Sequence, residues 1–156
     1  MTNPIHDIDH AISPELVKAY REALYVIYGE GGDIQLRVGQ SSPELTSLMR
    51  SHGASSAAFL TAFNPHSMLE AAEVNVTNHN ALIADIHTLG LKSISGEGED
   101  PSHLWPSEPS VLVLDISHQH AELLAGRYRQ NAYLWIADDG GLINLNFRYP
   151  VREPYQ

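Results

Sequence analysis

The chain has 156 residues, of which 43% are hydrophobic and 18% are charged, values typical of one globular domain with a substantial buried core. Its formal net charge of −10 disfavours nucleic acid as a partner, and the absence of cysteine excludes disulfides, thiolate catalysis and thiolate metal ligands. No stretch of the sequence has the length and apolarity of a membrane span, and the N-terminus lacks the regions of a signal peptide, so we expect a cytoplasmic protein.

The first half of the chain predicts two short helices, a hairpin and a long helix. Ser13 and Ser42 each precede a proline at the first helical position, and the first helix carries an apolar stripe of Leu16, Ala19, Tyr20 and Ala23. Residues 24–28 and 34–38 are predicted to form a hairpin around a glycine-rich turn. Residues 57–63 form an apolar strand, and a capping box from Ser67 to Glu70 predicts a helix to about Leu89.

The second half is predicted to contain a long loop followed by strand, helix and hairpin. Residues 91–109 lack a periodic pattern and are interpreted as a loop, which is often functional at this length. The continuous apolar run of residues 111–114 predicts a strand buried on both faces. Ser117 is the expected N-cap of the next helix, and residues 132–136 and 142–147 are the expected strands of a hairpin.

These elements predict an α/β fold, with α+β as the alternative. We expect a single domain with a mixed sheet of about six or seven strands and about four helices. Its expected boundaries are a flexible N-terminal arm at residues 1–12, a globular domain at 13–149 and a C-terminal tail at 150–156.

Two amides interrupt the apolar stripe of the long helix. The stripe of Leu82, Ile86 and Leu89, extended backwards by about 100° per residue, reaches Asn78 and Asn75. A buried amide without a partner costs about 1–3 kcal/mol, so each side chain needs a hydrogen bond. One interpretation is structural, with both amides fixing the 91–109 loop. The other is a polar pocket for a small polar ligand or a partner segment.

The functional interpretation places a set of polar and aromatic side chains around this pocket. Arg37 is included as an anion contact, and Gln130 and Asn131 are included although they also fit a simple helix end. The candidate ligand-binding residues are Asn64, His66, Asn75, Asn78, Trp105, Glu108, Gln130, Asn131 and Arg37.

Two other classes of function stay open. Oxygen ligands for Mg²⁺ or Mn²⁺ are available at Glu97, Glu99, Asp100 and Glu108, which would suit a metal-dependent hydrolase or nuclease-like enzyme, with a solvated loop as the competing explanation. Known nucleotide-binding, calcium-binding and zinc-protease motifs are absent from the sequence, so no other cofactor is predicted. A homodimer or other interaction module that uses the hairpins is the third alternative.

Several segments together also carry a family resemblance: residues 36–39, 61–67, Asn75 with Asn78, 96–101, 105–110 and 130–132. They resemble the DUF3293 family, bacterial domains of unknown function, over most of residues 20–138. The turn of that family usually reads Trp-Asn-Pro, so Phe63 and His66 are departures, which argues against a catalytic role for His66. The resemblance implies no activity, but it places the polar residues selected by helical spacing at motif positions of the family.

Overall fold

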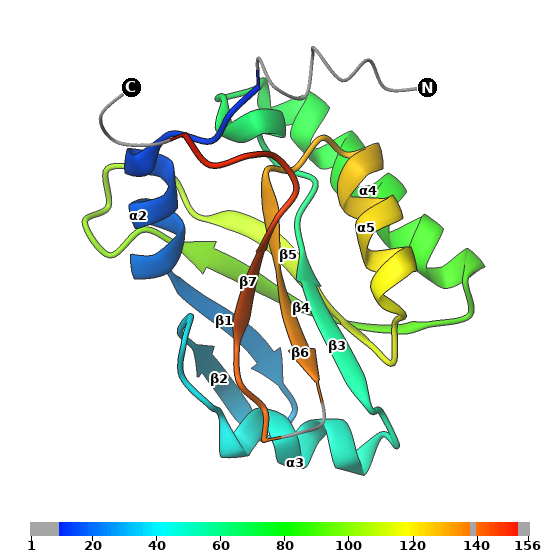
Figure 1. Ribbon diagram of the computed structural model, residues 1–156. Helices are drawn as coiled ribbons and strands as arrows, with labels where there is room; N and C mark the ends of the chain where they lie inside the picture. Colours follow the sequence, from blue (N-terminus) through cyan, green and yellow to red (C-terminus); the bar gives the residue numbers. More distant parts are fainter. Residues whose placement is uncertain (1–9, 138–139, 153–156) are drawn as a thin grey trace.

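The computed structural model describes residues 10–137 and 140–152, which form a curled seven-stranded sheet with helices outside it (Figure 1). The strand order is β2-β1-β4-β5-β3-β6-β7. The strands are β1 (Leu24–Gly29), β2 (Gly32–Leu36), β3 (Ser56–Leu60), β4 (Lys92–Glu99), β5 (Glu108–Leu114), β6 (Ala132–Ala137) and β7 (Asn144–Phe147). The helices are α2 (Pro14–Glu22), α3 (Pro43–Ser51), α4 (Ala72–Thr88) and α5 (His118–Arg127), with a short 3₁₀ turn, η1 (Pro65–Ser67).

The predicted fold class is confirmed, with helices and strands in the predicted numbers. The pairing within the sheet differs from the mixed arrangement we expected, because all six pairs of neighbouring strands are antiparallel. The sequence identifies segments that favour strands, but the partner of each strand depends on contacts between distant residues. Helix α4 connects β3 to β4, and β5 lies between these two strands in the sheet. Both β3 and β4 therefore run antiparallel to β5.

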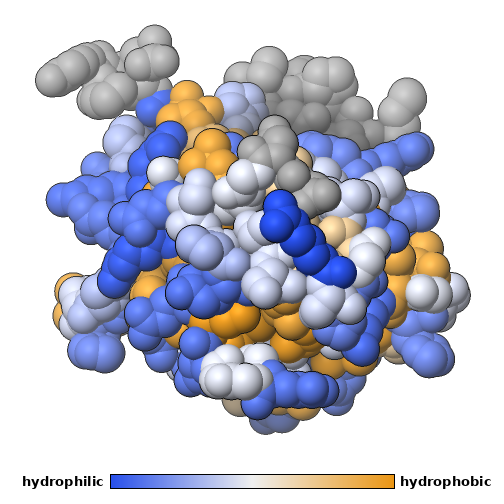
Figure 2. Space-filling view, turned by 90° about the horizontal axis from the view of Figure 1, so that it is seen from below, coloured by the Kyte–Doolittle hydropathy of each residue, from blue (hydrophilic) through white to orange (hydrophobic). Residues whose placement is uncertain are grey.

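The sheet has a core on each face, because side chains alternate along every strand. On β5, Val111 and Val113 belong to the core beneath α4 and α5, which lie side by side on one face (Figure 1). Leu112 and Leu114 belong to the core on the inner, concave face, which α3 closes at one end. Viewed from the α3 end, hydrophilic side chains surround apolar ones that show at the centre (Figure 2). The prediction that this strand is buried on both faces is confirmed.

Helix starts follow the predicted capping residues in three cases. The hydroxyl oxygens of Ser13, Ser42 and Ser117 accept hydrogen bonds from backbone N–H groups in the first turns of α2, α3 and α5, at 3.0–3.2 Å. Each bond satisfies one donor that the helix itself leaves without a partner. The predicted hairpin of β1 and β2 is also present, with Gly29 opposite Gly32 at its turn.

Two local predictions are wrong. The predicted loop at 91–109 contains β4, which pairs with both β1 and β5. Its glycine Gly96 permits this, because a Cβ there would lie 2.2 Å from the carbonyl oxygen of Val26 on β1. The long helix begins at Ala72 instead of Ser67, since Ser67 adopts a left-handed backbone with φ 58° and forms hydrogen bonds elsewhere.

The two ends of the described chain lie together. Ile12 is buried and forms a parallel bridge with Val151, supported by hydrogen bonds to the backbone of Pro150 and Arg152 at 2.8 Å. Residues 1–9 of the expected arm and 153–156 of the expected tail lie outside the described residues. Within the described ranges, no helix is both long enough and apolar enough to cross a lipid bilayer.

Candidate functional site: a cleft between the sheet and helix α2

A cleft of about 840 Å³ opens on the concave face of the sheet. Helix α2 forms one side, the strands form the floor, and the connection from β4 to β5 forms a further wall. The predicted apolar stripe of α2, formed by Leu16, Ala19, Tyr20 and Ala23, lines this cleft instead of packing into a core. No residue of α2 is fully buried. The helix therefore presents its apolar side to an open space.

The floor of the cleft continues the concave core face. Along β5, Glu108 and Ser110 lie on the same side of the strand as the buried Leu112 and Leu114, but only the first two line the cleft. Tyr25 on β1 and Phe59 on β3 pack edge to face, with ring centroids 5.6 Å apart, and both line the cleft together with Trp105. A carboxylate is thus placed in a row of apolar side chains with aromatic groups around it.

Two neutral donors hold the Glu108 carboxylate. The side-chain amide of Asn64 donates to Oε2 at 2.7 Å, and the indole N–H of Trp105 donates to the same oxygen at 3.0 Å. Among the described residues, Oε1 accepts no hydrogen bond. Burial raises the pKa of Glu108, and the hydrogen bonds from Asn64 and Trp105 counter that rise only in part.

Asn75 fixes Asn64 from behind the cleft. Its Oδ1 accepts from the backbone N–H of Asn64 at 2.9 Å, and its Nδ2 donates to Asn64 Oδ1 at 2.9 Å. Asn64 Oδ1 also accepts from the backbone N–H of Glu70, which fixes the amide so that Nδ2 faces Glu108. Asn64 and Asn75 are both buried and do not line the cleft. Asn78 is half-buried and forms no side-chain hydrogen bond with the described residues.

A second hydrogen-bond network forms the wall near α2. Asn131 Nδ2 donates to the hydroxyl of Tyr20 at 2.8 Å, and the hydroxyls of Tyr20 and Ser67 share a hydrogen bond at 2.5 Å. Asn131 Oδ1 accepts from the His10 ring at 2.7 Å. Burial raises the pKa of Tyr20, which keeps its phenol protonated at neutral pH. Sequence reasoning missed Ser67 as a wall residue and assigned Tyr20 to a core stripe, because these contacts join residues 47 or more positions apart.

Gln130 and Asn131 line the cleft, and neither is the left-handed residue that ends α5. That residue is Arg129, with φ 55°. Gln130 Nε2 donates to the backbone carbonyls of Phe63 and Tyr128 at 3.1 Å each, which ties the end of α5 to the turn after β3. Gln130 and Asn131 therefore do more than end a helix, because their side chains form hydrogen bonds with other parts of the chain.

A family model described as "Protein of unknown function (DUF3293)" matches residues 60–133. This segment is therefore similar to the DUF3293 family. The family resemblance suspected from the sequence is thereby confirmed for residues 60–133, and the DUF3293 segment contains Glu108, which lines the cleft, and its two donors. Helix α2 and β1 lie before that segment, so the cleft is built by both parts of the chain. Comparisons with curated proteins and with solved structures gave no match.

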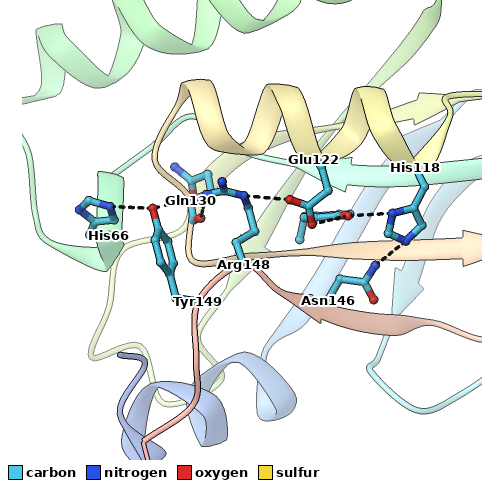
Figure 3. A network of polar contacts seen from close by, with 8 residues as sticks. His66, His118, Glu122, Gln130, Asn146, Arg148 and Tyr149 are labelled. Carbon is cyan, nitrogen blue, oxygen red and sulfur yellow. Dashed lines mark hydrogen bonds and ion pairs between the residues drawn. The ribbon is translucent and has the colours of Figure 1, made fainter. Parts of the chain in front are cut away.

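His66 of the DUF3293 segment lies outside the cleft, in the network of Figure 3. Its ring is 3.3 Å from the hydroxyl of Tyr149, and burial lowers its pKa, with further lowering by His10, Arg129 and Arg148. In the same network, Arg148 donates to the carboxylate of Glu122 at 3.3 Å and to the carbonyl of Gln130 at 3.0 Å (Figure 3). These contacts hold the C-terminal segment against α5.

Two other charged candidates, Arg37 and Asp100, also line the cleft. Arg37 is exposed and donates to the carbonyl of Glu22 at 3.4 Å. Asp100 accepts hydrogen bonds from Ser102, Leu104 and Trp105, which organise the start of the β4–β5 connection. The hydrogen bonds from Ser102 are the main reason that its pKa is lowered.

The four carboxylates considered for a metal do not converge on one point. Glu99 shares a hydrogen bond with Glu97, which raises the pKa of Glu99, whereas Asp100 organises its own turn and Glu108 is held by Asn64 and Trp105. Within residues 10–137 and 140–152, no group of three or more histidine or carboxylate side chains is placed to hold a metal ion.

Proposed function

We propose that this protein binds a small organic molecule with a flat apolar body in the cleft between α2 and the sheet. The observation that carries the proposal is the apolar stripe of α2, which faces a space of about 840 Å³ instead of a core. Small-molecule sites usually measure about 300–1,000 Å³ and have mostly apolar walls with a few fixed polar groups. A bound molecule would remove this apolar surface from water, at a gain of roughly 25 cal/mol per Å².

The polar groups of the cleft are fixed before any ligand arrives. Glu108 is held by two donors, and Tyr20 and Asn131 hold each other on the wall near α2. Because these side chains are already ordered, binding requires little further loss of conformational entropy. Such groups orient a ligand, whereas the aromatic walls supply most of the contact area.

Indole and 2-naphthol are suitable neutral probes, and ligand-observed NMR detects their binding. We expect saturation transfer from the protein to both probes. Ala19→Trp places a large side chain in the cleft from α2 and should abolish the transfer, because Ala19 lines the cleft. Ala84→Trp is the matched control, since Ala84 is also an exposed helical alanine but does not line the cleft. Equal transfer in wild type and Ala19→Trp, or none in wild type, contradicts the proposal.

A further inference from the structure

We infer that the ligand of this cleft is a small organic cation whose positively charged nitrogen is bound by the carboxylate of Glu108. The inference rests on the proposed small-molecule function and names the chemical class of the ligand. Glu108 is half-buried in the cleft, yet its two partners, Asn64 and Trp105, are neutral.

The carboxylate has one oxygen available for a ligand. Both donors bind Oε2, and Oε1 has no hydrogen-bond partner among the described residues. None of the ion pairs formed by the described residues involves Glu108. A buried carboxylate without a counter-charge is costly, and neutral donors compensate only part of that cost. An ammonium or amidinium nitrogen beside Oε1 would supply both the missing donor and the missing charge.

The charges around the cleft favour a cation over an anion. Four further acidic residues line it, Glu15, Glu22, Glu99 and Asp100, although the carboxylate of Glu99 pairs with that of Glu97, which does not line the cleft. Of the described residues that line the cleft, only Lys18 and Arg37 are basic, and Lys18 lies 4.0 Å from the carboxylate of Glu22. The cleft therefore has an excess of negative charge, which raises the local concentration of cations.

The walls specify the rest of the ligand. Tyr25, Phe59 and Trp105 surround the region of Glu108, and aromatic rings attract both apolar groups and cations. The class that fits both features is a primary amine or amidine attached to an aromatic or other flat apolar body. Simple inorganic cations lack the body, and carboxylates or phosphates would meet like charge at Glu108.

Tryptamine and tryptophol make a matched pair of probes, because they share the indole ring and differ in an ammonium against a hydroxyl group. Calorimetry at pH 7.5 should show tryptamine binding at least about tenfold more tightly to the wild type, as a charge-assisted hydrogen bond in a desolvated site allows. Glu108→Gln should bind both probes equally, because the amide keeps an acceptor for Asn64 and Trp105 but loses the charge. Glu30→Gln, an exposed carboxylate outside the cleft, should keep the tenfold preference.

The outcomes separate the two proposals. Equal affinity of both probes for the wild type, or a preference that survives in Glu108→Gln, overturns the cation inference and leaves the small-molecule function standing. Absence of binding by either probe at millimolar concentration overturns both.

The wild type also provides a test that needs no change at Glu108. Its preference for tryptamine should decline as the pH falls through the raised pKa of Glu108, because the protonated acid no longer attracts the ammonium. Glu99, whose pKa is also raised, lines the same cleft with Glu15, Glu22 and Asp100, and the phenols of Tyr20 and Tyr25 lie nearby. Glu99→Gln should keep the same decline, and a preference that is constant with pH overturns the inference.

Discussion

Replacement of Asn75 by leucine tests whether this amide supports the cleft from behind or belongs to a ligand-binding surface. The substitution removes both hydrogen bonds between Asn75 and Asn64, each 2.9 Å long, and a longer one from Nδ2 to the carbonyl of Glu70. Asn64 Oδ1 keeps its bond from the backbone N–H of Glu70. The backbone N–H of Asn64 loses its acceptor in a residue that is only 4% exposed, so water cannot replace the amide.

The size of the stability loss follows from the backbone N–H of Asn64, which is left without a hydrogen-bond acceptor. An unsatisfied buried hydrogen-bonding group costs about 1–3 kcal/mol, and the loss of the reciprocal bond adds to it, so we expect the free energy of unfolding to fall by about 2–3 kcal/mol. For a domain of this size, 1 kcal/mol corresponds to a Tm change of about 2–4 °C, which gives a decrease of about 4–12 °C.

Urea denaturation measures the free energy of unfolding directly, and the midpoint should decrease without a change of the m-value. Asn78→Leu is the matched control, because Asn78 is on the same helix but forms no side-chain hydrogen bond with the described residues. We expect its effect to remain within about 0.5 kcal/mol. Unchanged or increased stability of Asn75→Leu would refute the reasoning, because an amide that faces a ligand cavity can be replaced by an apolar group without cost.

Two further predictions concern β4 and the cleft carboxylate. Gly96→Ala should lower the free energy of unfolding by about 1–3 kcal/mol through overpacking, because its Cβ would lie 2.2 Å from a carbonyl oxygen of β1. Gly98→Ala, whose nearest neighbour would be 3.7 Å away, should not lower it, and equal urea midpoints for the two variants would contradict this contrast. Since folding raises the pKa of Glu108 above its ordinary value of 4.5, its carboxyl favours folding most at low pH, and this contribution is lost as the pH rises through the raised pKa. Thermal unfolding should therefore find Glu108→Gln more stable than wild type at pH 7, with the gap closing towards pH 4.5; a constant gap would contradict the role of burial.

The sequence predicts those features that depend on neighbouring residues. The three capping serines were identified because their hydroxyls act on N–H groups only three positions away. The burial of both faces of β5 followed from its continuous apolar run, and the inward orientation of Asn75 followed from the helical repeat. Asn75 does meet the turn after Phe63, although it contacts Asn64 rather than the cleft.

Features that depend on distant residues could not be predicted in this way. The polar, glycine-rich β4 has no apolar periodicity, and it is a strand because β1 and β5 supply hydrogen-bond partners on both sides. Ser67 matches a helix cap locally, but Tyr20 and Asn131 engage its hydroxyl. The stripe of α2 indicates which side of the helix is apolar, and it cannot indicate whether protein atoms fill the space opposite.

The direction in which the Glu108 side chain points depends on whether the number of residues between it and Leu112 on β5 is odd or even. Three residues separate Glu108 from Leu112, which places both on the concave side of the strand. Insertion or deletion of a single residue between them would turn the carboxylate towards α4 and α5 and leave Asn64 without its acceptor. Homologues that retain this carboxylate should therefore differ in length there by even numbers of residues, or accommodate an odd change in a β-bulge.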